Sequence, residues 1–319
     1  MTDAPGASAD VVIAGGGPAG LMCGYLLARA GIDVMVLEKH ADFLRDFRGD
    51  TVHPSTMTII DELGLLEPFL ARPHQKVQYA EGEIGERRVR LADFSHLPVK
   101  CPFIAFMPQW EFLDFLAEQA KAFPGFRLLM ETEAADLISA DGRVTGVVVR
   151  TPDGTRDITA RQLVVAADGR DSKLRARAGL EVRHLGAPMD VMWFRLPSQP
   201  GERPAVLGRI VAGHILVRLY RGDYWQCALV IRKGTAEEIK RQGLPAFRAR
   251  VAALLKRDDV EIESLDDVRV LTVRVDRLAR WSRPGLLVLG DAAHAMSPIG
   301  GVGINLAIQD AVAVANLLT

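Results

Sequence analysis

Short, continuously apolar runs along the chain indicate strands that are buried on both faces. Residues 11–14 (VVIA) and 34–37 (VMVL) are two such runs. Between them lie a glycine-rich turn and residues 21–30, whose pattern predicts a helix that Gly31 ends. A strand, a turn, a helix and a second strand within about 30 residues predict a right-handed β-α-β unit.

The later pattern predicts an interrupted first domain with an antiparallel sheet inserted into it. Helices are expected at 55–65, 110–123 and 304–318, a hairpin at 76–91 with Gly82 and Gly85 at its turn, two strands within 128–151, and buried strands at 163–167 and 286–289. Alternating segments at 191–196, 215–220 and 224–231 indicate a sheet with one exposed face. We therefore expect an α/β fold with 1–75, 100–180 and 270–319 in the first domain, and 76–99 and 181–269 in the second.

Composition and charge narrow the possible binding partners and cellular compartments of the protein. Of the 319 residues 49% are hydrophobic and 25% charged, and the net charge of -1 gives no electrostatic reason to expect a nucleic-acid partner. Three cysteines without C-x-x-C spacing suggest neither disulfides nor a metal site, and favour the cytoplasm. No transmembrane segment is expected, although peripheral membrane contact stays open. The helical pattern that breaks off at Thr319 suggests a missing C-terminal segment.

The turn after the first strand carries the pattern G-x-G-x-x-G. Gly15 suits the tight turn, Gly17 lets the backbone approach a pyrophosphate, and Gly20 lets helix and strand pack closely. Glu38 ends the second strand, where a carboxylate can accept hydrogen bonds from ribose hydroxyls. These features predict a dinucleotide site, and both FAD and NAD satisfy them.

Two later motifs also follow predicted buried strands. The first is DGRDSKLR, from Asp168 to Arg175. The second comprises GDAAH from Gly290, then Pro298, the run GGVGIN from Gly300, and Asp310. An aspartate at a strand end can bind a sugar hydroxyl, and a glycine-rich helix start can meet a phosphate or carbonyl oxygen.

In this order, the three segments resemble those of the group A flavoprotein monooxygenases, the family of para-hydroxybenzoate hydroxylase and the ubiquinone-pathway hydroxylases. The resemblance implies a Rossmann-like, glutathione-reductase-type FAD/NAD(P)-binding domain and an antiparallel-sheet substrate-binding domain. It implies FAD as cofactor, NADH or NADPH as co-substrate, and O₂ as oxidant. The expected reaction is hydroxylation of an aromatic or quinone-like small molecule through a C4a-hydroperoxyflavin.

The resemblance also assigns cofactor-binding residues. They are Gly15, Gly17, Pro18, Ala19 and Gly20 at the pyrophosphate, Glu38 and Lys39 at the ribose, Arg48 near the pyrophosphate, Gln109 at the ribityl chain, Ala134 at the adenine, Asp168 at FAD and the nicotinamide nucleotide, Gly290 and Asp291 on the ribityl side, and Pro298, Gly301, Val302, Gly303, Ile304 and Asn305 beside the isoalloxazine ring. His294, in the same motif as Asp291, is expected to position its loop.

The catalytic acid or base is not assigned by these motifs. His53, His214, Tyr220 and Tyr224 are the candidates, and for each a structural or exposed role fits the sequence better. Two alternatives to hydroxylation also stay open. One is a related FAD-dependent reductase or dehydrogenase without oxygen insertion, and the other is a flavin-binding protein with no turnover of its own.

Overall fold

The computed structural model describes residues 7–44, 51–199, 201, 206–211, 213–258 and 260–319. The chain divides into two compact units. Unit 1 comprises Met1–Pro73, Met107–Leu185 and Val275–Thr319, and unit 2 comprises His74–Phe106 and Gly186–Arg274. The sequence placed 74–75, 100–106 and 270–274 in the first domain and 181–185 in the second. The structure has each of these segments in the other unit. The reason is strand pairing: β7 (Ile104–Phe106) pairs with β4 (Gln75–Val77), β17 (Arg269–Leu271) with β13 (Met189–Pro197), and β12 (Val182–His184) with β18 (Asp276–Leu278).

Unit 1 is built on a mostly parallel sheet. Its order is β19 (Ser282–Arg283), β20 (Leu286–Val288), β11 (Gly154–Ala166), β1 (Ala7–Ala14), β2 (Val34–Leu37) and β8 (Phe126–Leu129), with every pair from β20 to β8 parallel. Ala14 lies opposite both Leu37 and Ala166, and Ala166 lies opposite Val288. Four strands therefore end side by side at one edge of the sheet.

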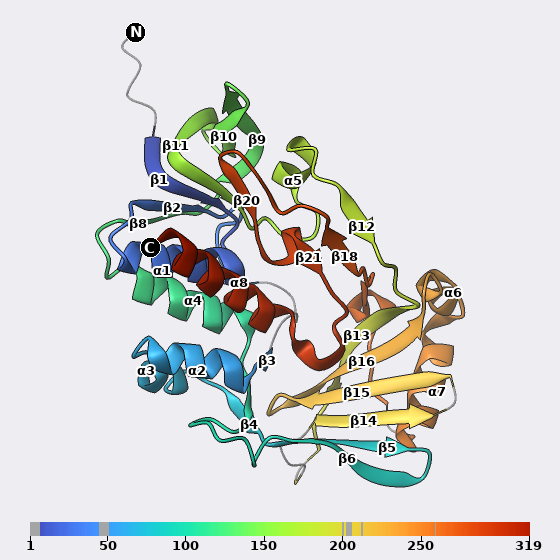
Figure 1. The fold of residues 1–319 in the computed structure, drawn as a ribbon. Coiled ribbons are helices and arrows are strands. Elements are labelled where there is room, and N and C mark those ends of the chain that lie inside the picture. The colour runs from blue at the N-terminus through green and yellow to red at the C-terminus, as the bar shows by residue number, and fades with distance from the viewer. Residues whose placement is uncertain (1–6, 45–50, 200, 202–205, 212, 259) are drawn as a thin grey trace. The chain divides into compact units, whose positions relative to one another are not determined.

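The two faces of this sheet are covered differently (Figure 1). Helices α1 (Pro18–Arg29), α4 (Gln109–Ala120) and α8 (Gly303–Leu318) lie on one face, with α1 packed against both of the others. On the other face, β9 (Glu133–Ala140) and β10 (Arg143–Thr151) continue from β11 as an antiparallel layer. Val12 and Met35 face this layer and join Val147 and Val149 in one apolar cluster.

The remaining elements of unit 1 are short. They are β3 (Thr51–Val52), α2 (Pro54–Glu62), α3 (Leu66–Leu70), α5 (Lys173–Arg177) and a small sheet of β12, β18 and β21 (His294–Ala295), with single 3₁₀ turns at Gly290–Ala292 and Ile299–Gly301. The first helix begins three residues before the predicted Leu21, because Pro18 is tolerated at the first helical position, where its missing N–H costs nothing.

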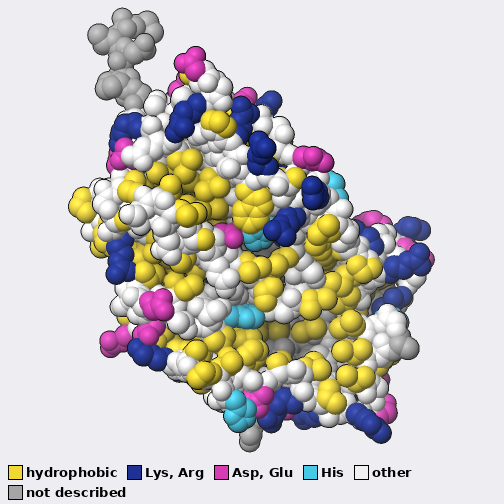
Figure 2. Space-filling view, viewed as in Figure 1, with side chains coloured by type: hydrophobic (Ala, Val, Ile, Leu, Met, Phe, Trp, Pro, Cys, Tyr) yellow, Lys and Arg dark blue, Asp and Glu magenta, His cyan; other side chains and the backbone are white. Residues whose placement is uncertain are grey.

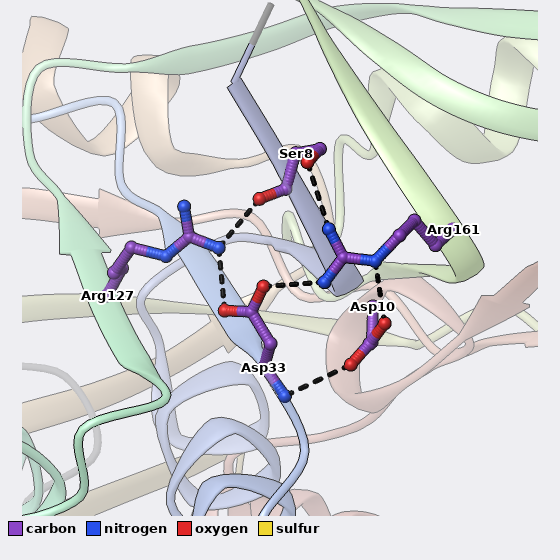
Figure 3. Close-up of polar contacts among 5 residues, drawn as sticks. All are labelled: Ser8, Asp10, Asp33, Arg127 and Arg161. Atoms are coloured by element: carbon purple, nitrogen blue, oxygen red, sulfur yellow. Dashed lines mark hydrogen bonds and ion pairs between the residues drawn. The ribbon is translucent and has the colours of Figure 1, made fainter.

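The N-terminal ends of the sheet strands are tied by a polar network (Figure 3). The Arg161 guanidinium on β11 donates to Asp10 Oδ1 at 2.8 Å, to Asp33 Oδ2 at 2.7 Å and to Ser8 Oγ at 2.9 Å. Arg127 on β8 donates to the other oxygen of Asp33 and to the Ser8 carbonyl. This network joins β1, β8 and β11 to the residue before β2, at the edge opposite the aligned strand ends.

Unit 2 contains a seven-stranded sheet. The order is β17, β13, β16 (Tyr224–Arg232), β15 (His214–Tyr220), β14 (Val206–Val211), β5 (Tyr79–Ile84) and β6 (Arg87–Asp93), and its pairs are antiparallel except β14 with β5. The predicted hairpin turns at Gly85. Gly82 lies within β5 and not at the turn. A Cβ added at Gly82 would stand 3.2 Å from the Gly208 carbonyl oxygen of the neighbouring strand.

One face of this sheet packs on helices, and we call the opposite side the second face. Helices α6 (Ala236–Arg241) and α7 (Gly243–Leu255) share an apolar cluster with the side chains that point toward them, such as Leu216 and Trp225. The second face is defined by Val191, Trp193, Val217, Ala228 and Val230. Figure 2 shows hydrophobic side chains gathered over β13, β15 and β16.

Among the described residues, one helical stretch is long and apolar enough to cross a membrane by length and composition alone. It runs from Ile299 to Leu318, with a mean hydropathy of 1.4 and 39% of its window buried. Ile304, Ile308 and Ala311 are buried in unit 1, and α8 packs against α1. These contacts are those of a core helix.

Candidate functional site

The predicted motifs meet at the edge where the four parallel strands end. The glycine turn directly follows β1, and Glu38 directly follows β2. Asp168 lies two residues after the end of β11, and Gly290 lies two residues after the end of β20. Ligand sites of open α/β sheets lie outside the carboxyl ends of the strands. The structure therefore brings the three sequence motifs to one edge of one unit.

The three motif glycines of the turn have different surroundings. A Cβ at Gly15 would stand less than 3.0 Å from the Ala167 carbonyl, and one at Gly20 would overlap the Gly15 carbonyl oxygen. Gly15 also has a φ of 108°, in the region that favours glycine. A Cβ at Gly17 would meet no atom within 4 Å. Packing explains Gly15 and Gly20, whereas Gly17 leaves room beside the start of α1 that the protein does not fill.

Glu38 is buried and holds the turn from the end of β2. Its Oε2 accepts from the Gly16 backbone N–H at 3.0 Å, and its Oε1 accepts from the His40 backbone N–H at 3.1 Å and contacts the His40 ring. A carboxylate has about four lone-pair sites. The two oxygens can therefore serve the backbone and still accept hydrogen bonds from a sugar.

Asp168 organises its own loop. Ser172 Oγ donates to Asp168 Oδ1 at 2.5 Å, and the Leu174 backbone N–H donates to Oδ2 at 3.2 Å. Burial raises the pKa of the Asp168 carboxyl, and these hydrogen bonds oppose that rise. Ser172 also caps α5 by accepting from the Arg175 N–H. The carboxylate thus folds the DGRDSKLR segment into a compact turn.

Two arginines of this loop reach the third motif, and the sequence assigned neither a role. Arg175 donates to the Ala292 carbonyl at 2.9 Å and to the Arg170 carbonyl at 2.8 Å. The Arg170 guanidinium lies 3.6 Å from Asp291 Oδ2. The signal in the sequence that could have indicated this link is the position of Arg175 at the end of the DGRDSKLR motif. The two segments are therefore joined directly, and Asp291 stands next to a positive charge.

The turn at Gly290 is held from α8. Asp310 Oδ2 accepts from the Gly290 backbone N–H at 3.0 Å and lies 2.6 Å from His294 Nε2. The hydrogen bond to Asp310 raises the pKa of His294, against the effect of burial. Trp281 stacks on the His294 ring at 5.0 Å. The His294 ring is thus held between Asp310 and Trp281.

Asn305, at the start of α8, binds residues of the segment from Thr51 to Thr56, which lie 249 to 254 residues earlier in the chain. Its Oδ1 accepts from the His53 backbone N–H and from Thr56 Oγ1, both at 2.8 Å. Its Nδ2 donates to the carbonyls of Thr51 and Gly301 at 3.1 and 3.2 Å. An amide side chain can make about four hydrogen bonds. The Asn305 side chain is thus fully used inside the protein, and only its backbone is left to meet a ligand.

Two helix starts at this edge lack side-chain caps. The N-cap residues are Gly17 for α1 and Val302 for α8, and neither helix has an acidic residue in its first turn. Uncapped helix starts present N–H groups and a partial positive charge, which suit phosphate and carbonyl oxygens. Together with the unfilled space at Gly17, these starts fit a dinucleotide with an anionic centre and a polar ring.

Other predicted cofactor residues lie in unit 1 with weaker ties to this edge. Ala134 is buried on β9, two residues after Thr132, whose backbone N–H donates to the Glu38 carbonyl. Gln109 is the first residue of α4, and Lys39 is exposed next to Glu38. Arg48 lies outside the described residues. Pro18 and Ala19 open α1, and Pro298 precedes the turn at Ile299–Gly301.

The predicted acid–base candidates are dispersed. His53 lies in unit 1 beside Asn305. In unit 2, strand alternation puts His214 and Tyr220 on the same side of β15 as Leu216, which faces α6 and α7. Tyr224 has the opposite orientation, on the second face, where Arg195 lies 4.7 Å from its ring centre. Of the three unit 2 candidates, Tyr224 alone lies on the second face.

A β-α-β glycine turn, a carboxylate at the next strand end and two later segments at the same edge define a dinucleotide-binding flavoprotein. A family model described as "FAD binding domain" matches residues 8–319, and the chain belongs to this family, within the group A FAD-dependent monooxygenases. The fold is accordingly the Rossmann-like FAD-binding fold with a second, substrate-binding domain expected from the sequence.

Named relatives are similar over most of the chain. A 6-methylpretetramide 4-monooxygenase from Streptomyces rimosus is 33% identical over 317 residues, 97% of this chain and 75% of that protein. A para-nitrophenol 4-monooxygenase from Pseudomonas sp. (strain WBC-3) is 26% identical over 94% of this chain and 75% of its own length. The solved structure of anhydrotetracycline hydroxylase from S. rimosus matches with a TM-score of 0.76 and 26% identity, over 97% of this chain and 61% of that one.

Proposed function

We propose that this chain acts as an FAD-dependent monooxygenase that hydroxylates an aromatic or quinone-like small molecule. NADH or NADPH serves as reductant and O₂ as oxygen source. The observation that carries the proposal is the meeting of the three motifs at one strand edge, beside the space left at Gly17. The monooxygenase and hydroxylase names of the relatives support oxygen insertion over a reductase or dehydrogenase reaction.

Each segment of the edge has a binding task in this proposal. The start of α1 with Gly15, Gly17 and Gly20 holds the pyrophosphate, and Glu38 accepts from the hydroxyls of the adenosine ribose. Asp291 serves the ribityl chain. Gly301–Asn305 present backbone N–H groups to the carbonyl end of the flavin ring. Bound FAD supplies the redox chemistry and the reaction with O₂, and the protein orients it and excludes water.

The second face of unit 2 is the proposed surface for the organic substrate. Its residues are mostly apolar, as pockets for small aromatic ligands are. Tyr224 places a hydroxyl on this side, and the nearby Arg195 guanidinium supplies a positive charge that can favour a phenolate oxygen. We therefore rank Tyr224 above His214 and Tyr220 as a substrate-contacting residue. We place the protein in the cytoplasm, where NAD(P)H is made, in keeping with its three buried cysteine thiols.

The test combines a spectrum with oxygen labelling. Purified protein is expected to carry an oxidised-flavin absorption spectrum and to oxidise NADH or NADPH faster when a phenol or hydroquinone from a substrate panel is present. Under ¹⁸O₂ the organic product should gain one labelled oxygen atom. Glu38→Ala should lose the flavin, while Glu181→Ala, an exposed carboxylate of the same unit, serves as the matched control.

Two outcomes would overturn the proposal at different depths. Product formation at an undiminished rate without O₂ would replace the hydroxylase with a reductase or dehydrogenase. Protein that neither carries nor binds FAD would remove the flavin function altogether.

A further inference from the structure

The imidazole of His53 has a buried nitrogen that the protein does not satisfy. Nε2 of His53 is shielded from solvent and has no hydrogen-bond partner among the described residues. A buried polar atom left without a partner costs about 1–3 kcal/mol, so such atoms in native proteins usually have a partner that a ligand or water supplies. Burial lowers the pKa of His53, while a hydrogen bond to the Gly300 backbone has a smaller, opposite effect. The ring is therefore neutral at pH 7.

The backbone that carries this ring is held by hydrogen bonds to the segment that begins α8. The His53 backbone N–H donates to Asn305 Oδ1 at 2.8 Å, and His53 is the N-cap residue of α2, with Pro54 following. Two residues before His53, the Thr51 hydroxyl Oγ1 donates to the Gly301 carbonyl at 2.6 Å. These contacts fix the backbone that carries the imidazole beside Asn305 and Gly301, at the place where its unsatisfied nitrogen is buried.

The ring lies beside the glycines that precede α8. His53 has a hydrogen bond to the Gly300 backbone that raises its pKa, and both Gly300 and Gly301 have positive φ values, of 80° and 61°. They lead into Val302, the uncapped start of α8. In the proposed function this helix start receives the carbonyl end of the flavin ring. His53 is thus at the ring end of the cofactor site and not at its pyrophosphate end.

We propose that His53 is a positioning residue for the isoalloxazine ring of FAD, with its Nε2 hydrogen-bonded to the polar edge of the ring. The inference rests on the proposed flavin function. The polar edge of an isoalloxazine offers both an N–H group and carbonyl oxygens, so a neutral imidazole finds a partner in either tautomer. Cofactor binding then satisfies the buried nitrogen and removes the cost of leaving it unpaired.

Three substitutions separate a ring contact from a folding role. In His53→Gln the amide reaches about as far as Nε2, whereas in His53→Asn it reaches only as far as Nδ1. His53→Ala removes both. Ser55→Ala, an exposed position two residues on in the same helix, is the matched control. For each protein the dissociation constants of FAD and of ADP, which lacks the flavin ring, are measured on apoprotein, together with the absorption spectrum of bound FAD.

The expected result is a selective loss. His53→Ala and His53→Asn should raise the Kd for FAD roughly 3- to 30-fold and alter the shape of the visible flavin band, with the Kd for ADP unchanged. His53→Gln should recover most of the FAD affinity, and Ser55→Ala should resemble the wild type.

Several results would contradict the role of His53. Unchanged FAD affinity and spectrum in His53→Ala would remove the ring contact, and recovery by Asn but not by Gln would assign the contact to Nδ1. Equal losses of FAD and ADP binding in all three variants would show a folding role. Wild-type protein that binds neither FAD nor ADP would instead refute the proposed function.

Discussion

Substituting Gly17 by alanine separates the glycine that serves a ligand from those that serve packing. In the apoprotein the new methyl group meets no atom within 4 Å, and the backbone φ of -79° suits any residue. Alanine at a helix N-cap is less favourable than glycine by up to about 1 kcal/mol. Against this, replacing glycine restricts the unfolded chain and stabilises by about 0.4–1 kcal/mol. The two effects nearly cancel, so the stability of the apoprotein should change by less than about 1 kcal/mol.

The same methyl group should strongly weaken the binding of FAD. A pyrophosphate over the start of α1 would occupy the space that the methyl enters, and overpacking of this kind costs about 1–3 kcal/mol. The Kd for FAD should therefore rise roughly 5- to 150-fold. Isothermal titration of the apoprotein with FAD measures this rise, and urea unfolding of the same sample measures stability.

Gly20→Ala is the matched contrast. Its Cβ would overlap the Gly15 carbonyl oxygen, a backbone atom that cannot move aside cheaply. This variant should lose at least about 1–3 kcal/mol of apoprotein stability. Wild-type FAD affinity in Gly17→Ala would refute the reasoning, because the pyrophosphate would then lie elsewhere. A large loss of apoprotein stability in Gly17→Ala would also refute it, since the space would then belong to the protein.

Three further changes test the supports of the site. Arg161→Ala should lower the urea midpoint of unfolding only slightly, because its exposed ion pairs are individually weak, and the effect should shrink in about 1 M salt. The raised pKa of His294 means that its pair with Asp310 stabilises fully below the ordinary histidine pKa and is lost as pH rises through the raised value. Asp310→Asn should therefore flatten the fall of the melting temperature as pH rises above the ordinary histidine pKa of about 6.5. Glu38→Gln should weaken FAD binding about tenfold in titrations, because an amide has only one oxygen for Gly16 and the ribose.

Local patterns predicted the elements of unit 1 well. The runs at 11–14 and 34–37 are in β1 and β2, both buried, and the helices expected at 110–123 and 304–318 became α4 and α8 with shifts at their ends. Such elements have an apolar periodicity that is visible in a short window. The parallel pairing of β14 with β5 could not be read this way, because its partners are more than 120 residues apart and share no local signal. The prediction of a turn at Gly82 was wrong for the same reason, since a glycine there allows the close approach of the neighbouring strand at Gly208.

The sequence also predicted which segments form the candidate site, but not how their atoms are used. Motif residues were chosen by type, and Asp168 and Asn305 are of types that commonly bind ligands. In the structure, both oxygens of Asp168 accept from its own loop, and the amide of Asn305 is saturated by four internal bonds. Such partners depend on how distant segments meet. For the same reason the links from Arg175 to Ala292 were not foreseen.

The residues at this strand edge fall into two groups: those whose identity is explained by contacts within the protein, and those whose identity is not. Gly15, Gly20 and Asn305 are required by close packing or by internal hydrogen bonds, so any damage from changing them would appear in the apoprotein. Gly17 and His53 are different, because one leaves space that no protein atom uses and the other leaves a buried nitrogen unsatisfied. Polar groups in natural interiors are paired, so the unsatisfied nitrogen of His53 costs stability unless a ligand uses it, whereas the open space at Gly17 leaves room for one. A bound flavin dinucleotide, with its pyrophosphate at one helix start and its ring at the other, accounts for both at once.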